Sequence, residues 1–469
     1  MSSPSGPSLA RVTIAAPKRR MDIALPDNML VAELLPHLLR HADGALGESS
    51  ERNGGWVLRR ATGSTLEPHR NLSVQGVRDG ELLHLDLARD DWPELAYDDV
   101  VEVIASGARR AGRSWGGDAT RRCGLTVTAV ALFVGLLGLA VSGPHWRTPA
   151  LIALVVALAL TLGGILLSRA FSDSNAGGVV AASALLYAFF GGAWLLTPDD
   201  AGPLGIGAPG LLLGSAALLV FSVLGHTGVA GLTRLFVAGI TAALTGLLAA
   251  LLCLAGMSAD GAAAIALTAA IGLLPSYPVV ASWIGRLPFP ELPNRAEEIL
   301  KEKPMPRRAD VFAAVVRASE VLTGLLLSAA VCSVVAIIYL TLDEPRLSGV
   351  LLIMAAVAAL LLRARLLPTP QQRVPLLVAG LTGLTVLGLG AALGGTGPAP
   401  GLMLLAGAIV IAGIALPAAL IYSRRPPSPY VGRAADMLDV LAIMALIPLA
   451  CSVIGVFGAI RGLFASIGG

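Results

Sequence analysis

The feature that most constrains this chain is an abrupt loss of charge after Arg122. Residues 123–142 hold no charged side chain over twenty consecutive positions, about the length that an α-helix needs to cross a hydrocarbon core of ~30 Å. Only 14% of the chain is charged, whereas soluble domains carry roughly 25%, and the deficit lies almost wholly after this point. The sequence therefore predicts a cytoplasmic domain over residues 1–88, a charged linker over 89–122 and a membrane domain over 123–469.

Residues 9–88 have the pattern of a small α+β domain. Runs of alternating apolar side chains predict strands, and apolar side chains at helical spacing predict one helix. The expected elements are strands at 11–14, 21–25, 56–59 and 81–87, and a helix that starts at Asp27 or Asn28. The first two strands are expected to place five apolar side chains on one face: Val12, Ile14, Met21, Ile23 and Leu25. A tight turn is predicted at 76–80, because glycine stands at both of its ends.

The order of these elements, with one helix covering one face of the sheet, is a β-grasp arrangement and resembles ubiquitin. Ubiquitin's conjugation chemistry is not expected, because the last strand runs into Ala88, Arg89 and Asp90 instead of a free Gly-Gly tail. Gly468 and Gly469 do end the chain, but they follow a predicted membrane helix.

Charge and metal-ligand spacing narrow the chemistry further. Residues 1–88 contain ten Lys or Arg and ten Asp or Glu, a balance that argues against nucleic-acid binding. The four cysteines lie in or beside apolar segments without a CxxC motif, so they are expected to pack as small apolar side chains. A GxGxxG match at 205–210 follows no predicted strand and contains Pro209, so no nucleotide is expected there. We predict no cofactor, no metal and no catalytic residue.

The linker changes sign along its length. Its first half is acidic, and a solvated stretch without a partner explains it as well as a binding role does. Its second half is basic, which fits contact with anionic lipid headgroups and the positive-inside rule. The arginines that we expect to contact lipid headgroups are Arg109, Arg110, Arg113, Arg121 and Arg122.

The remainder of the chain is expected to cross the membrane eleven times. The predicted spans are 123–142, 149–168, 177–197, 207–225, 234–256, 262–284, 320–340, 348–362, 374–393, 402–422 and 435–460. With the N-terminus placed inside, loops and span ends on the inner side hold fifteen Lys or Arg, against three on the other side. This excess predicts a cytoplasmic N-terminus and a C-terminus on the outer side of the membrane.

The deep parts of the predicted spans lack Asp, Glu, Lys, Arg and His. Because such residues are expensive inside a bilayer and usually mark an ion path, an ion-coupled transporter is disfavoured. Asp436 and Asp439 stand at the predicted start of the last span, where they are expected to complement the helix dipole. Local kinks are predicted at the prolines within spans, which are Pro275, Pro278, Pro417 and Pro448.

The long loop at 285–319 is a second candidate for partner contacts. Asn294 followed by Glu297 resembles a capping box, which predicts a short helix. An apolar stretch that starts at Asp310 is expected to lead into the seventh span. We favour a cytoplasmic docking element over a membrane-surface helix with only a topological role. The residues expected to contact partners are Asn294, Arg295, Glu297, Arg307, Arg308 and Phe312.

A cytoplasmic ubiquitin-like domain, a basic linker and eleven spans with a long loop between the sixth and seventh together resemble the EccD family. The run Gly76-Val77-Arg78-Asp79-Gly80 before the last strand fits this resemblance. EccD proteins are the polytopic components of actinobacterial type VII (ESX) secretion systems. The resemblance implies an inner-membrane complex with EccB, EccE and the FtsK/SpoIIIE-like ATPase EccC. It also implies a second copy of the chain around a lipid-filled vestibule, and export of WXG-type or PE/PPE-type substrates.

Two functions from different classes remain open at this point. The first is a non-enzymatic scaffold of a secretion complex, whose cytoplasmic domain and long loop bind partner subunits. The alternative is a small-solute transporter or permease with a regulatory ubiquitin-like domain. A membrane-embedded transferase is weakly supported, because no cluster of acidic, His or Cys residues lies at a predicted membrane surface.

Overall fold

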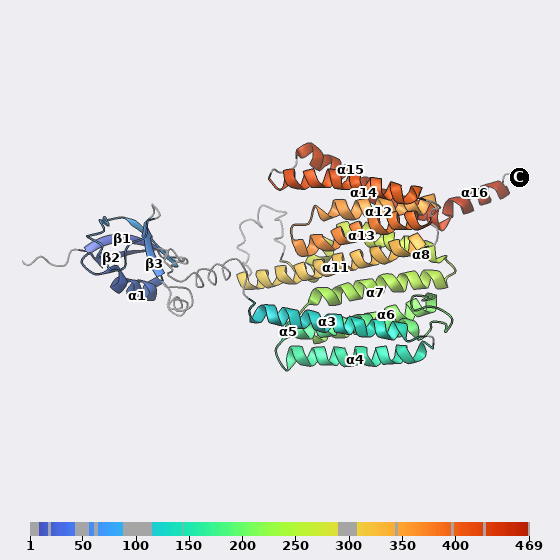
Figure 1. Cartoon of the computed structure of the whole chain (residues 1–469), viewed down its shortest axis with the longest axis horizontal. Coiled ribbons are helices and arrows are strands. Elements are labelled where there is room, and N and C mark those ends of the chain that lie inside the picture. The colour runs from blue at the N-terminus through green and yellow to red at the C-terminus, as the bar shows by residue number, and fades with distance from the viewer. Residues whose placement is uncertain are drawn as a thin grey trace, which may run out of the picture. The chain divides into compact units, whose positions relative to one another are not determined.

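The protein folds as two compact units, Met1–Trp115 and Gly116–Gly469. The computed structural model describes residues 9–16, 20–42, 56–60, 64–87, 115–143, 145–288, 307–342, 346–394, 398–424 and 428–467. Figure 1 shows the small sheet-containing unit and the helical bundle.

The first unit is a four-stranded mixed sheet with one helix. Its elements are β1 (Leu9–Ala15), β2 (Arg20–Pro26), α1 (Val31–Ala42), β3 (Trp56–Arg60) and β4 (Leu82–Leu87). The strand order is β2-β1-β4-β3, in which the central pair β1 and β4 is parallel and the other two pairs are antiparallel. Parallel pairing requires a crossover, and α1 supplies part of it. The predicted β-grasp arrangement is confirmed.

The predicted hairpin face is also confirmed. Val12 lies opposite Ile23, and Ile14 lies opposite Met21, so both pairs contribute to the core between the sheet and α1. The helix, however, begins at Val31, later than the predicted Asp27 or Asn28. Its first free backbone N–H groups need acceptors, and loop carbonyls supply them: Val31 donates to Arg70 at 3.2 Å and Ala32 to Pro68 at 2.9 Å. Sequence spacing alone does not reveal this backbone cap.

The turn before β4 has the conformation that its glycines predict. Gly76 and Gly80 have φ values of +68° and +84°, in the left-handed region that glycine enters without strain. The Gly80 N–H donates to the Arg11 carbonyl at 2.6 Å, and the Arg11 N–H donates to the Asp79 carboxylate at 2.7 Å. These two bonds hold the start of β4 beside β1.

The second unit is a helical bundle with eleven helices long and apolar enough to cross a membrane among the described residues. Its helices are α3 (Gly117–Val141), α4 (Arg147–Arg169), α5 (Ser174–Trp194), α6 (Ala208–Gly228), α7 (Thr233–Leu254), α8 (Ala259–Gly272), α9 (Tyr277–Ile284), α11 (Arg308–Leu342), α12 (Leu347–Ala364), α13 (Pro370–Gly394), α14 (Ala399–Tyr422), α15 (Pro429–Ile454) and α16 (Val456–Ile467). The predicted number of spans is confirmed.

Several helix boundaries differ from those of the predicted spans. The first span begins at Gly117, so Arg121 and Arg122 are helical residues and not linker residues. The sixth span consists of α8 and α9, joined by the short 3-10 helix η2 (Leu274–Ser276), and the prolines predicted to kink it lie at this break. The last span ends at Ile454, because Gly455 adopts a φ of +87° and turns the chain into α16.

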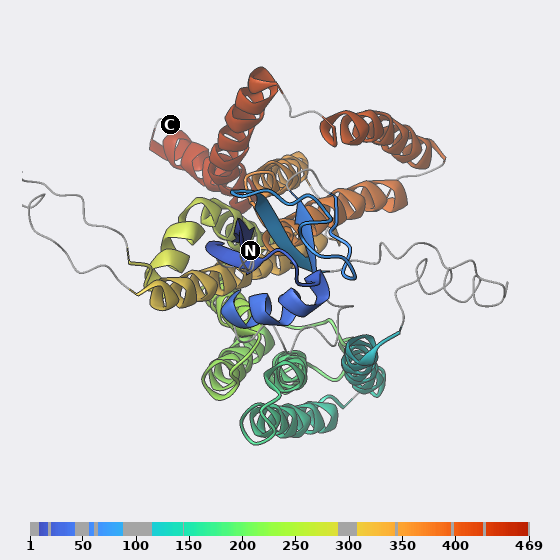
Figure 2. The same cartoon turned by 90° about the vertical axis from the view of Figure 1, so that its left-hand side faces the viewer.

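Small residues set the packing of the bundle. A Cβ atom on Gly164 of α4 would lie 2.7 Å from the Gly177 carbonyl oxygen of α5, so these helices touch backbone to backbone. Helices α8, α11, α12, α13 and α15 share the largest cluster of buried apolar side chains. Figure 2 shows the bundle end-on, with α14 at its edge beyond α13, and no side chain of α14 is buried.

Candidate functional site

Ionic contacts between helices gather at one end of the bundle, the end at which α3 begins, called here the α3 end. Among the described bundle residues, the ion pairs are Arg121–Asp173, Arg234–Glu320, Arg363–Asp439 and Arg365–Asp436. Glu320 and Asp439 lie within long helices, but they pair with arginines near the ends of α7 and α12. These ion pairs therefore form one polar layer at the α3 end.

The predicted role of Asp436 and Asp439 as helix-dipole partners is wrong. Helix α15 begins at Pro429, with Ser428 as its N-cap, so the two carboxylates lie in its second and third turns. They instead pair with Arg365 and Arg363 at the end of α12. A helix dipole acts within the first turn, whereas an i, i+3 pair on one face of α15 can reach two arginines of a neighbouring helix.

The Arg363–Asp439 pair is buried, while its neighbour is not. The Arg363 Nη1 atom lies 2.9 Å from the Asp439 Oδ2 atom, and the Asp439 side chain is 4% exposed. The Asp436 side chain is 60% exposed. Because removing one partner of a buried pair leaves an uncompensated charge, losing Asp439 should destabilise the contact between α12 and α15 more than losing Asp436.

Helix α11 extends past its neighbours at the α3 end (Figure 1). At 1.5 Å per residue its 35 residues span about 52 Å, roughly 20 Å more than the hydrocarbon core requires. Glu320 lies beside Arg234 near the start of α7, and Ala318 packs on Gly285 just after α9 ends. Residues 308–317 therefore form an extension beyond the ends of both helices.

The α11 extension has two unlike faces. Phe312, Val315 and Val316 stand at i, i+3 and i+4 on one face, and the Phe312 side chain is 76% exposed. Ala314 and Ala318, on the opposite face, are buried. Arg307 and Arg308 lie exposed at the tip. The apolar stretch predicted to lead into the seventh span is thus confirmed as a helix continuous with that span, and it presents an apolar face with cations beside it.

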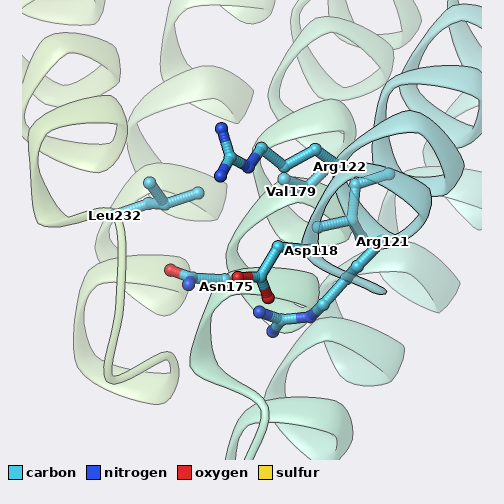
Figure 3. Close-up of a pocket in the computed structure, with 7 residues that line it drawn as sticks. Asp118, Arg121, Arg122, Asn175, Val179 and Leu232 are labelled. Carbon is cyan, nitrogen blue, oxygen red and sulfur yellow. The ribbon is translucent and has the colours of Figure 1, made fainter. Parts of the chain in front are cut away.

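Several predicted site residues lie outside the described residues. These are Asn294, Arg295 and Glu297 of the long loop and Arg109, Arg110 and Arg113 of the linker. Of the predicted headgroup contacts, Arg121 and Arg122 are described, and both line a hollow between α3, α5 and the start of α7 (Figure 3). Within the described residues, no group of three or more His, Cys, Asp or Glu could hold a metal ion.

Arg121 and Arg122 differ in their partners. Arg121 pairs with Asp173, which also caps α5 by accepting a hydrogen bond from the Ala176 N–H at 3.0 Å. That N–H is the main cause that lowers the pKa of Asp173, and the Arg121 guanidinium adds to the effect. Arg122 forms no ion pair with any described residue. The sequence placed both arginines alike, because it does not show which one faces the N-terminus of α5.

The arginines are distributed unequally between the two ends of the bundle. The described arginines at the α3 end are Arg121, Arg122, Arg169, Arg234, Arg286, Arg307, Arg308, Arg317, Arg363, Arg365, Arg373, Arg424 and Arg433. The described arginines at or beyond the other end are Arg147, Arg346 and Arg461. The α3 end therefore carries most of the described arginines. The positive-inside rule associates such an excess with the cytoplasmic side of a membrane.

Comparison with known proteins matches both units. A family described as "EccD-like transmembrane domain" matches residues 120–463, and one described as "WXG100 protein secretion system (Wss), protein YukD" matches residues 9–85. The ESX-4 secretion system protein eccD4 of Mycobacterium tuberculosis (strain ATCC 25618 / H37Rv) is 26% identical over 479 residues, which cover 98% of each chain.

Two solved structures share the fold. One is protomer 1 of the ESX-3 core complex, with a TM-score of 0.59 and 22% identity over 96% of this chain and 100% of that one. The other is a chain of the MycP5-free ESX-5 inner membrane complex, with a TM-score of 0.54 and 19% identity over 88% of this chain and 100% of that one.

Proposed function

The chain belongs to the EccD family, as its resemblance predicted, and on that basis we propose that it is a multi-pass membrane scaffold of a type VII secretion complex. In this role it performs no catalysis and binds no cofactor. It holds partner subunits at the cytoplasmic face of the inner membrane. Secreted WXG-type or PE/PPE-type substrates meet it indirectly, through the complex.

The observation that carries this proposal is the separation of charge from the interior of the bundle. The interhelical ion pairs of the described residues gather in a layer at the α3 end, and no described ionisable pair lies between that layer and the far end. A relay for ion-coupled transport needs ionisable groups at depth. A rigid apolar bundle with one charged face suits a scaffold better.

We assign the α3 end to the cytoplasm, because it carries the larger share of the described arginines. The N-terminus is then cytoplasmic, and the C-terminus, after an odd number of spans, is on the outer side. The ubiquitin-like domain and the α11 extension both stand on the side where an ATPase would act.

The α11 extension is the proposed docking element. Its exposed apolar face, with Arg307, Arg308 and Arg317 beside it, suits a partner segment that combines apolar side chains with carboxylates. EccB, EccE and the EccC ATPase are the proposed partners. The unburied side chains of α14 leave an apolar face for lipid or a second copy of this chain.

A matched pair of substitutions tests the docking role. The Phe312 and Phe171 side chains are 76% and 75% exposed, and both lie at the α3 end, but only Phe312 belongs to the α11 extension. The full complex is purified in mild detergent with a tag on this chain, and co-purifying subunits are quantified. Phe312→Glu is expected to reduce recovery of the ATPase several-fold, whereas Phe171→Glu is expected to leave it unchanged. Equal recovery from the two variants contradicts docking at this helix.

A second measurement separates the scaffold from a transporter. The purified chain is reconstituted alone in liposomes, and efflux of entrapped small solutes and ions is followed. The scaffold proposal expects no flux above that of empty liposomes. Saturable flux of one solute class by the chain alone favours the permease.

A further inference from the structure

From the hollow beside α3 we propose a binding site for a zwitterionic aminophospholipid headgroup, of the phosphoethanolamine class. The hollow has a volume of about 400 Å³, within the range of ~300–1,000 Å³ that small-molecule sites occupy. Its described lining consists of Asp118, Arg121, Arg122, Leu125, Asn175, Val179 and Leu232. Figure 3 shows the polar side chains of Asp118, Asn175 and Arg122 around this space, with Leu232 across from them.

The charges in the hollow indicate which class of headgroup would bind there. Asp118 and Arg122 stand at i and i+4 on one face of α3, yet neither forms an ion pair with a described residue. Arg121 is already neutralised by Asp173. The hollow therefore holds one exposed cation and one exposed anion without an ion-pair partner among the described residues. A phosphoethanolamine headgroup offers a phosphate to Arg122 and, two carbons away, an ammonium group to Asp118.

A purely anionic headgroup fits less well. It satisfies the Arg122 guanidinium but leaves the Asp118 carboxylate beside a second negative group. A choline headgroup carries a quaternary nitrogen without N–H donors, so it cannot donate a hydrogen bond to that carboxylate. The Asn175 amide supplies a further donor and acceptor on the α5 side of the hollow.

The apolar part of the lining suits a lipid better than a free headgroup. Leu125, one turn further along α3, together with Val179 and Leu232, provides a wall for the upper acyl chains. Leu232 has a φ of +53°, a left-handed conformation that leucine rarely adopts. Its side chain packs on Gly178, where an added Cβ atom would lie 2.7 Å from Leu232 Cδ1. Such strained residues gather at ligand sites.

Native mass spectrometry of the purified full chain tests this site. The protein is titrated with equal mixtures of phosphatidylethanolamine, phosphatidylglycerol and phosphatidylcholine of the same acyl composition. Preferential retention of phosphatidylethanolamine is expected. Arg122→Gln should weaken retention of phosphatidylethanolamine and phosphatidylglycerol by about three- to tenfold, since both offer a phosphate. Asp118→Asn should weaken phosphatidylethanolamine alone and so shift the preference towards phosphatidylglycerol.

Matched controls come from the same end of the bundle. Arg373→Gln and Asp310→Asn remove exposed charges of the same kinds outside the hollow, and neither should alter lipid retention. Equal effects of Arg122→Gln and Arg373→Gln would overturn the site. Unchanged headgroup preference in Asp118→Asn would overturn the zwitterionic assignment.

A competition experiment distinguishes a membrane lipid from free phosphoethanolamine as the ligand of the hollow. Soluble O-phosphoethanolamine carries the same charges without acyl chains. It should not displace the retained phosphatidylethanolamine at equal concentration, because it lacks the contacts with Leu125 and Leu232. Displacement at equal concentration would overturn the assignment to a lipid.

Discussion

The Arg363 guanidinium of α12 donates to the buried Asp439 carboxylate of α15 over 2.9 Å, and so ties two spans that are far apart in sequence. One turn away, Arg365 and the exposed Asp436 form a parallel contact between the same helices. The two pairs offer a comparison of a buried and an exposed ion pair within one helix contact.

Asp439→Asn is expected to destabilise the bundle by about 3–5 kcal/mol, because Arg363 then keeps a partly buried charge without its partner. Asp436→Asn, at an exposed pair, should cost at most about 1 kcal/mol. Thermal unfolding in detergent, followed by circular dichroism, measures both. Replacing both buried partners, as Arg363→Met with Asp439→Leu, should recover most of the loss, and failure to recover it would contradict the assigned cause.

Gly164→Ala should loosen the contact between α4 and α5, because its Cβ atom would lie 2.7 Å from both the Gly177 carbonyl oxygen and the Ala181 Cβ atom. Gly163 provides an adjacent control, since a Cβ atom there meets nothing within 4 Å. We expect a loss of about 1–3 kcal/mol for the first variant and no loss for the second, measured by thermal unfolding. Equal stability of the two variants would contradict a requirement for glycine at position 164 in the contact between α4 and α5.

Tyr187→Phe should weaken the attachment of α3, which has Leu136 as its one buried residue. The Tyr187 hydroxyl donates to the Leu132 carbonyl at 2.6 Å, and the expected loss is about 0.6–2 kcal/mol. A Cβ atom at Gly135 would lie 2.8 Å from that hydroxyl, so Gly135→Ala should cost less in the Tyr187→Phe background. A double-mutant cycle measures this coupling, and strict additivity of the two losses would count against it.

The Asp173 cap should make stability depend on pH only in the acidic range. Its folded pKa is lowered, mainly by the Ala176 N–H and further by Arg121, so its contribution is complete above the unfolded pKa and is lost as pH falls through the folded value. Asp173→Asn should therefore lower the melting temperature at pH 7. The difference from the natural chain should shrink between pH 7 and a pH below the folded pKa of Asp173, where both side chains are uncharged. A constant difference at both pH values would exclude this carboxylate as its source.

Local patterns were enough to predict most of the fold. Alternation placed Val12 and Ile14 on the inner face, and the run of uncharged residues after Arg122 located the first span. Both signals act over a few residues and depend on side-chain polarity alone. The helix start at Val31 was missed because its N–H groups are satisfied by Pro68 and Arg70, which are distant in sequence.

The site residues were predicted less well than the fold, again because their partners are distant in sequence. The sequence singled out Arg121 and Arg122 as candidate contacts for lipid headgroups, but treated them as equivalent linker residues. Only the packing of α3 beside α5 shows that both arginines line the hollow, and that Arg121 pairs with Asp173 while Arg122 has no ion-pair partner among the described residues. Likewise, Asp439 appears at the start of a predicted span in the sequence, and its partner on α12 is visible only in the folded bundle.

The amino-acid order thus determines the solvent of each segment: which residues avoid water, how many spans there are and which end of the bundle is basic. The free energy of transferring a side chain out of water is a local property, so it can be read residue by residue. Tertiary structure alone decides which charges pair and which remain free. Pairing depends on distances of a few ångströms between helices, and these are set by the small residues, such as Gly164, where the helices meet.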